Sequence, residues 1–512
     1  MLVIDKKKII LFVLVFLLLV ISLFPRSIEV LNGNPVFEID QGRDYMAVKD
    51  IVVNHKFTLI GAELGAGQAG LMYLFHGPGY FYFLTLPFLL FNSNPVGGVF
   101  LMLFLGLLAI LFGMYFVWKF WGATEGFIMA FLLAACPYLI GQSRFFENHF
   151  GTPIFILLVF YYVFLATKSV KTNNSRYLFL ASFISAFIYN LEFAIAIPLC
   201  IALVVYSLFL YRKEFISKLP IILGGFLLGF LPMILFEARH GFMGIKSLFG
   251  YISFHQKAYI SQKPMGTHIY GLYLLLIQTF LDSFPAKLLL PGTIVPTVLW
   301  SFFGTTIFVL FREKDKTKKN FLLFLLLLFP VNFFVFMLLR NIVFQHYVTD
   351  LLLAFLFFMV FVWSWLYKNG LKKTALVLFL YVTVLVAVGG YKGIIVAKSD
   401  YYDYGGVHKL KGKTDAIDFI YNDADKKPFG LFVFTPGVYT YPYDYLVWFE
   451  GTKKYGYTPN QEKKGTFYLL IEKDIAKPWS YIGWEETVIK EGKVVFQKTL
   501  KGELIVEKRI VE

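Results

Sequence analysis

Charged residues are scarce in this chain of 512 residues. Asp, Glu, Lys and Arg supply 16% of it, whereas soluble domains carry about 25%. Hydrophobic residues supply 58%, which exceeds the roughly 45–50% of an ordinary water-soluble fold. Segments such as Val96–Val117 and Phe321–Leu339 are almost free of charge. Each is long enough to cross a hydrocarbon layer of about 30 Å as a helix, so we expect much of the surface to contact lipid.

Cysteine is also nearly absent, because Cys136 and Cys200 are the only two. Both lie inside apolar segments, which argues against a disulfide framework and against a thiolate metal site. The chain has no zinc-binding motif, P-loop, dinucleotide fingerprint or nucleophilic serine elbow. A divalent metal at the acidic cluster described below has no motif in its support, so no cofactor and no metal ligand is predicted.

The net charge of +15 is concentrated in six short links between apolar segments. These links hold 18 basic and 4 acidic residues, which accounts for nearly all of the excess positive charge. A nucleic-acid-binding protein would instead gather its charge on one soluble face, so no nucleic-acid partner is expected. Cytoplasmic loops of membrane proteins collect Lys and Arg. The links, which we therefore place in the cytoplasm, are residues 1–8, 117–122, 168–176, 211–218, 312–319 and 368–373.

This arrangement predicts an all-α polytopic protein of the plasma membrane with about eleven transmembrane helices. The first segment ends at Phe24-Pro25-Arg26 without a small-residue cleavage site, so it is a retained span with a cytoplasmic N-terminus. An odd number of spans places the C-terminus outside. The apolar stretches Tyr80–Phe91 and Tyr270–Phe280 are short, and we expect them to lie on the outer surface or to be re-entrant. The predicted spans are 9–24, 96–117, 123–141, 150–167, 176–190, 193–210, 219–236, 291–311, 320–339, 346–367 and 372–391.

Two parts follow from this topology. Residues 1–392 form a membrane body that includes a long outer loop over residues 25–95, and a second outer segment covers Glu237–Pro291. Residues 399–512 are more polar and show short alternating runs, which predict a small extracytoplasmic α/β domain. We expect strands at Leu431–Phe434, Thr466–Ile471 and Val494–Gln497, and a helix at Lys413–Asp423 that is capped by Thr414.

An acidic motif, Glu38–Asp44, follows the first span directly. Asp40 and Asp44 are four residues apart and would share one face of a helix. A carboxylate held there can accept a proton from a hydroxyl group, and Arg43 could pair with one acid while the other stays free. The alternative is structural, with Asp40 as the helix cap and Asp44 in the first turn.

A second motif, His76-Gly77-Pro78-Gly79-Tyr80, indicates the start of a helix. Helix N-termini attract phosphate, and His76 would lie beside this one. The alternative is a simple turn into a surface helix. Further charged residues occur at predicted outer helix ends, where cations can meet lipid phosphates or can extend to the interface without binding anything. These residues are Arg144, Glu147, Glu192, Arg239, His240, Arg340 and His346.

The order of these parts resembles the GT-C membrane glycosyltransferases, in particular the protein O-mannosyltransferase and aminoarabinose transferase superfamily. The resemblance covers residues 1–392 and rests on Asp40–Asp44, His76–Tyr80, the acidic outer link at Glu147, and the later Arg and His residues. It implies that Asp40 is the base or orients the acceptor, with Asp44 as second choice. Family members often carry Asp where this chain has Glu147, and Lys where it has His76.

The resemblance implies a glycosyltransferase that moves a sugar from a polyprenyl-phosphate donor to an acceptor hydroxyl of a lipid, glycan or protein at the extracytoplasmic face. Asp40, Asp44 and Glu147 would be catalytic, with Arg43 and Glu192 nearby. His76, Arg144, Arg239, His240, Arg340 and His346 would bind the donor phosphate. Partners would be the donor and membrane lipids. The alternatives are a flippase or transporter of lipid-linked glycans, and a polymerase or ligase of surface polysaccharide.

Overall fold

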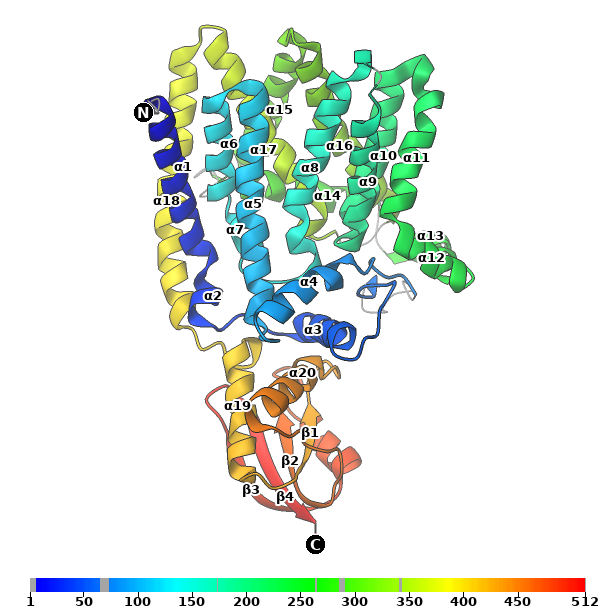
Figure 1. The fold of residues 1–512 in the computed structure, drawn as a ribbon, viewed down its shortest axis with the longest axis vertical. Helices are drawn as coiled ribbons and strands as arrows, with labels where there is room; N and C mark the ends of the chain where they lie inside the picture. Colours follow the sequence, from blue (N-terminus) through cyan, green and yellow to red (C-terminus); the bar gives the residue numbers. More distant parts are fainter. Residues whose placement is uncertain are drawn as a thin grey trace, which may run out of the picture.

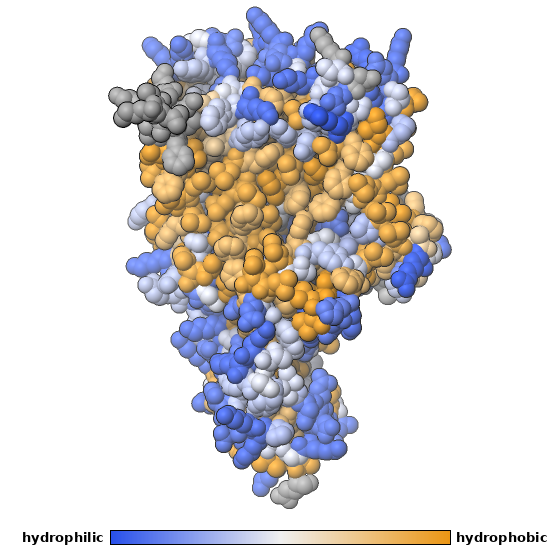
Figure 2. Space-filling model, in the orientation of Figure 1, coloured by the Kyte–Doolittle hydropathy of each residue, from blue (hydrophilic) through white to orange (hydrophobic). Residues whose placement is uncertain are grey.

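The computed structural model describes residues 6–64, 73–172, 174–262, 265–284, 291–339 and 343–511. A bundle of helices forms most of the molecule, and a small α/β unit lies at one end of it (Figure 1). An apolar belt covers the visible face of the bundle, with hydrophilic residues at the far end and over the small unit (Figure 2). Because a bilayer offers no water to backbone groups, the segments behind this belt satisfy their hydrogen bonds as helices.

The bundle and its connecting loops contain most of the helices. They are α1 (Lys6–Arg26), α2 (Ile28–Asn32), α3 (Ile39–Val52), α4 (Gly79–Leu90), α5 (Val96–Trp121), α6 (Ala123–Ala135), α7 (Pro137–Gln142), α8 (Thr152–Lys168), α9 (Arg176–Phe187), α10 (Phe193–Tyr211), α11 (Phe215–Gly229), α12 (Leu231–Arg239), α13 (Met243–Gln262), α14 (Met265–Asp282), α15 (Val295–Arg312), α16 (Lys316–Leu339), α17 (Thr349–Lys368) and α18 (Lys372–Tyr402).

Seven helical runs among the described residues are long and apolar enough to cross a membrane. One of them, Phe193–Gly229, contains both α10 and α11, joined by a turn at Arg212–Glu214. Shorter apolar helices at Val13–Arg26, Gly79–Leu90 and Ala123–Ala135 accompany them. The expected polytopic, mostly helical membrane protein is therefore confirmed, while the count of about eleven spans stays a prediction.

Small residues allow neighbouring helices to approach closely. Gly225 and Gly229 are four residues apart on α11 and face α9. A Cβ atom at Gly225 would lie 2.7 Å from the Phe179 carbonyl oxygen, and one at Gly229 would lie 2.6 Å from the Phe183 carbonyl oxygen. Packing of this kind replaces the hydrophobic driving force that lipid does not supply.

The two short apolar stretches behave differently from each other. α4 begins at Gly79, as the Gly-Pro-Gly motif predicts, and lies across the end of the bundle beside α3 (Figure 1). α14 packs inside the bundle, where Phe280 contacts Phe302 of α15 and Phe355 of α17 at ring distances of 5.6 and 5.2 Å. At the other end of this stretch Tyr270 is 59% exposed, so the outer-surface or re-entrant position expected for Tyr270–Phe280 stays a prediction.

The basic links lie at the end of the bundle opposite α3, α4 and the α/β unit (Figure 1). The turns between α5 and α6, α10 and α11, α15 and α16, and α17 and α18 all meet there, and Figure 2 shows this end as strongly hydrophilic. The basic links, which the sequence predicts to lie on one side of the membrane, are thus at one end of the bundle in the structure.

The small unit contains a four-stranded mixed sheet in the order β1-β2-β4-β3. β1 and β2 are parallel, and the other neighbours are antiparallel. The three predicted strands are present, but a fourth strand, β4, and two helices, α20 and α21, were not predicted from the sequence. The helix predicted at Lys413–Asp423 begins earlier, so Thr414 lies inside it and is no cap. The elements are α19 (Leu410–Ala424), β1 (Gly430–Phe434), α20 (Tyr441–Glu450), β2 (Gly465–Ile471), α21 (Ser480–Trp484), β3 (Lys493–Thr499) and β4 (Ile505–Val511).

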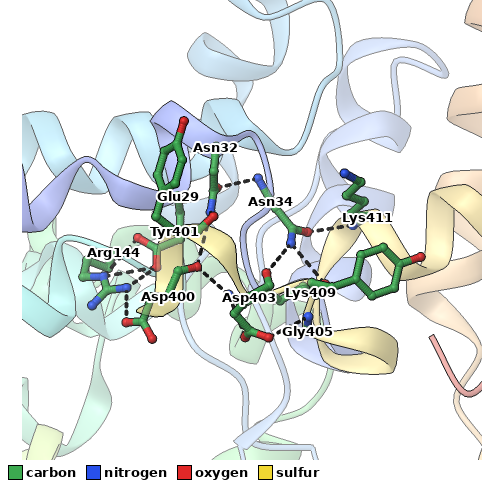
Figure 3. Close-up of polar contacts among 11 residues, drawn as sticks. Glu29, Asn32, Asn34, Arg144, Asp400, Tyr401, Asp403, Gly405, Lys409 and Lys411 are labelled. Carbon is green, nitrogen blue, oxygen red and sulfur yellow. Dashed lines mark hydrogen bonds and ion pairs between the residues drawn. The ribbon is translucent and has the colours of Figure 1, made fainter. Parts of the chain in front are cut away.

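α18 continues to Tyr402, beyond the boundary predicted at residue 392, and connects the bundle to the small unit. A polar network fixes this connection (Figure 3). The Asn34 side-chain amide donates to the carbonyls of Asp403 and Tyr404 at 3.2 Å each, and the Asn34 side-chain oxygen accepts from the Lys411 amide at 2.8 Å. The segment after the first helix and the start of α19 therefore hold each other in place.

Candidate active site

The acidic motif forms the first turns of α3. Glu38 and Gln41 make a capping box, which fixes the start of the helix, so Asp40 is not its cap. Arg43 donates to Asp40 at 2.6 Å and to Asp44 at 2.8 Å. The Asp44 side chain is 1% exposed and that of Asp40 is 56% exposed. One arginine thus holds a buried and an accessible carboxylate together.

Gln41 connects this motif to the link between α7 and α8. Its side-chain nitrogen donates to Glu147 Oε1 at 3.1 Å and to the Phe146 carbonyl oxygen at 3.3 Å. The Glu147 side chain is 31% exposed. The second predicted carboxylate is therefore joined to the first cluster by a direct contact between segments about a hundred residues apart.

His76 reaches the same region from the turn before α4. Its Nε2 atom lies 3.4 Å from the side-chain nitrogen of Asn148, the residue next to Glu147. The turn packs against Asn190, whose side-chain oxygen accepts from the Gly79 amide at 3.1 Å. A Cβ atom at Gly79 would lie 2.8 Å from the Asn190 Cβ atom, so this close approach requires glycine.

Two further histidines and a carboxylate extend the cluster into the bundle. The rings of His149 and His346 are stacked, with centroids 3.9 Å apart. His149 Nε2 lies 3.5 Å from Glu147 Oε2, and His346 Nε2 lies 4.0 Å from Glu192 Oε2. Of the described residues, His149, Glu192 and His346 form the group with the donor types and spacing of metal ligands.

Burial sets the protonation of this region. It raises the pKa of Asp44 to about 6, against the opposing charge of Arg43. It also raises the pKa of Glu147 to about 7 and that of Glu192 to about 8. Burial lowers the pKa of His76 to about 3, so the free site holds this ring neutral and it acts as a hydrogen-bonding group. The cluster therefore contains carboxyl groups that titrate near neutral pH.

The structure brings together Asp40, Arg43, Asp44, His76, Glu147, Glu192 and His346 from the predicted set. Arg144 lies elsewhere: it donates to Glu29 at 3.0 Å and to Asp400 at 2.7 Å, tying α2 to α18 (Figure 3). Two carboxylates thus neutralise its charge. Arg239 and His240 are exposed at the end of α12. Arg340 falls outside the described residues.

Several residues of the cluster were not in the predicted set. His149 joins Glu147 to His346, and Asn148 contacts His76. The run Glu147-Asn148-His149 could have indicated His149 from the sequence, because adjacent polar residues in a short outer link lie at the same end of the bundle. Asn190 gave no local signal, since its role depends on the glycine turn that packs against it.

No family model matches the chain, and no curated protein matches it in sequence. Solved structures do match. The aminoarabinose transferase ArnT from Cupriavidus metallidurans bound to undecaprenyl phosphate has 13% identity and a TM-score of 0.59, covering 99% of this chain and 99% of that one. Its apo state has 12% identity, covers 98% of each chain and gives the same TM-score of 0.59.

An oligosaccharyltransferase from Archaeoglobus fulgidus, in a complex with zinc and sulfate, is also similar. It has 13% identity and a TM-score of 0.50, covering 95% of this chain and 72% of that chain. This chain has the GT-C fold. Because the match to ArnT covers 99% of this chain, the likeness includes the α/β unit as well as the bundle. At these identities the likeness concerns the fold, and the residues of the site must be argued from their own chemistry.

Proposed function

We propose that this chain transfers a sugar from a polyprenyl-phosphate donor to an acceptor hydroxyl. The observation that carries the proposal is the meeting of Asp40, Glu147 and His76 at the end of a lipid-facing bundle. The donor has a lipid tail and an anionic headgroup, so its enzyme needs polar groups at this depth. The GT-C fold supports the proposal, and ArnT was solved with undecaprenyl phosphate.

Asp40 is the general base in this proposal, because it is the accessible member of the carboxylate pair. It accepts the proton of the acceptor hydroxyl, whose oxygen forms the new bond to the anomeric carbon of the sugar. The bond between that carbon and the donor phosphate oxygen breaks, and the phosphate leaves with the electron pair. Asp44 stays buried and orients Arg43, which in turn fixes Asp40.

The departing phosphate gains negative charge as its bond to the sugar breaks, so it needs hydrogen-bond donors close to its oxygens. His76 and His346 lie at the cluster, and a neutral imidazole can donate one hydrogen bond to a phosphate oxygen. Glu147 is the second carboxylate and is placed to orient the acceptor through its contact with Gln41. Arg239, His240 and Arg340 stay predicted phosphate ligands. Arg144 is left out of this role because Glu29 and Asp400 already neutralise it.

The proposal includes sidedness. If the end that carries the basic links is cytoplasmic, then α3, α4 and the α/β unit from about residue 403 are extracytoplasmic. Reporters fused to either terminus test this assignment. A phosphatase reporter that is active only outside the membrane should work at the C-terminus and fail at the N-terminus, and the reverse result would remove the assignment.

The proposed chemistry can be tested with Asp40→Asn in purified, detergent-solubilised protein. The substrate is a radiolabelled polyprenyl-phosphate sugar with a membrane extract as acceptor source, and the product is separated from free polyprenyl phosphate. We expect the rate to fall at least about 100-fold, the usual contribution of a general base. Asp50→Asn, an exposed change on the same helix, is the matched control. A flippase would move the donor without breaking the sugar–phosphate bond, so intact donor after incubation with parent protein would contradict the proposal.

A further inference from the structure

His149, Glu192 and His346 come from three separate segments and meet at one point. His149 lies in the 3-10 turn Asn148–Gly151, Glu192 precedes α10, and His346 lies in the 3-10 turn Gln345–Val348. Their ligand atoms all lie within 4.8 Å of one another. The side chains of His149 and Glu192 are 9% and 5% exposed, and that of His346 is 26% exposed. A buried group of two imidazoles and a carboxylate is uncommon without a role.

The distance between His346 and Glu192 is longer than a hydrogen bond. His346 Nε2 lies 4.0 Å from Glu192 Oε2, whereas direct bonds of this type are about 2.7–3.2 Å. Donor atoms that share a tetrahedral zinc ion are about 3.4 Å apart, given metal–ligand bonds of about 2.1 Å. The separation of His346 and Glu192 is therefore nearer to that of two ligands around a common cation than to that of a direct hydrogen bond.

The donor set selects the class of ion. Neutral imidazole nitrogens suit zinc and the neighbouring divalent transition metals, whereas magnesium and calcium prefer oxygen ligands. The free cysteines, Cys136 and Cys200, do not contribute to the group. Three protein ligands leave a fourth position open, as in catalytic zinc sites. Glu147 lies beside the group, with its Oε2 atom 3.5 Å from His149 Nε2.

We propose that His149, Glu192 and His346 bind one divalent transition metal ion of the zinc type, with an open fourth position beside Glu147. The metal site rests on the convergence of these three ligand groups within 4.8 Å and does not depend on sugar transfer. The two rings are nearly parallel, with an interplanar angle of 20°, so both cannot direct an in-plane nitrogen at one ion. His346 is the more exposed ligand on a short turn, and binding turns its ring edge-on to His149.

Metal binding to the full-length chain in detergent tests this proposal. The protein is first treated with a chelator, and Zn²⁺ binding is then measured by equilibrium dialysis with elemental analysis. Co²⁺ serves as a second probe, because its visible absorption reports four-coordinate nitrogen and oxygen ligands. We expect one equivalent to bind to the parent protein, with the absorption bands of a four-coordinate ion.

Two variants make the test specific. Glu192→Gln keeps a side-chain oxygen for the Ala194 amide, which Glu192 caps, but removes the carboxylate. His346→Ala removes the exposed ligand. Each should weaken Zn²⁺ binding by about tenfold or more, while His240→Ala, an exposed histidine at the end of α12, should not.

Two outcomes would overturn the site. One is the absence of stoichiometric binding to a folded parent protein, as judged by a cooperative thermal transition. The other is binding that persists unchanged in both Glu192→Gln and His346→Ala. Loss of sugar transfer with metal binding intact would count against the proposed function and leave the metal site standing.

Discussion

Gly42 lies where the α/β unit contacts the candidate site, and its replacement should disturb both. It follows Asp40 and Gln41 on α3, and α20 packs against it. A Cβ atom at this position would lie 2.6 Å from the Pro442 Cα atom and 2.6 Å from the Tyr441 carbonyl carbon. These are backbone atoms, so no side chain can rotate away to make room.

The structure sets the size of the effect. An ordinary contact begins at 3.4 Å and the Pro442 backbone nitrogen lies nearer still, so Gly42→Ala must move α3 and α20 apart by at least about 0.8 Å. Overpacking of this kind costs about 1–3 kcal/mol of stability. Displacement of catalytic groups by about 1 Å can cost about 100-fold in rate. Because Asp40 and Arg43 flank Gly42 on the same helix, we expect the rate to fall much more than the stability.

The assay compares sugar transfer and the thermal unfolding midpoint for Gly42→Ala and a matched control. Gly304→Ala is suitable, because Gly304 lies within α15 and a Cβ atom there would meet nothing within 4 Å. The control should keep the parent rate and stability, since alanine favours a helix over glycine. If Gly42→Ala transferred sugar at the parent rate, docking of α20 would not position Asp40, and this reasoning would be refuted.

Two other predictions concern charges. Burial raises the pKa of Asp44 to about 6, so lowering the pH from 7 to 5 should protonate Asp44. Arg43 then loses one of its two carboxylate partners, and the rate of sugar transfer should fall by up to about tenfold. In Asp44→Asn this part of the pH profile should be absent. The pKa of Asp44 in the folded protein lies above its ordinary value of 3.8. The contribution of Asp44 to folding stability is therefore fully present below pH 3.8 and is lost as the pH rises through 6. The fall in rate at low pH should thus occur without a lower thermal unfolding midpoint. Arg144→Gln leaves the buried Glu29 without its cation and should lower the free energy of unfolding by about 3 kcal/mol, measured by chemical or thermal unfolding. An unchanged unfolding midpoint would show that the ion pairs between α2 and α18 do not stabilise the fold.

Part of the fold follows from composition alone. Lipid requires helices wherever the chain is apolar for about 20 residues, so Val96–Val117 and Phe321–Leu339 are helices whatever their neighbours. The glycine and proline of the motif at Gly77 and Pro78 likewise fix a helix start locally. The strands of the α/β unit were found where their pattern alternates. β4 was missed because its Glu507 and Arg509, buried against the sheet as an ion pair, interrupt the apolar pattern that the sequence displays.

The candidate site divides in the same way. The sequence showed which reactive residue types are present, but its residues alone did not decide between Asp40 and Asp44 as the base. The structure distinguishes them by exposure, because Asp40 is accessible and Asp44 is buried. Arg144 looked like a phosphate ligand because nothing in its neighbourhood in the sequence shows Glu29 or Asp400, which come from helices far along the chain.

The sequence by itself therefore determined which segments enter lipid, which end of the bundle carries the positive charge, and which short motifs hold reactive groups. Those properties are local, since hydropathy, charge and turn chemistry act over a few residues. Tertiary structure alone decided that Gln41 contacts Glu147, that His149 stacks on His346, and that α20 supports α3. These contacts join segments separated by a hundred residues or more, and only the packing of side chains selects them from the many pairings that the same sequence allows.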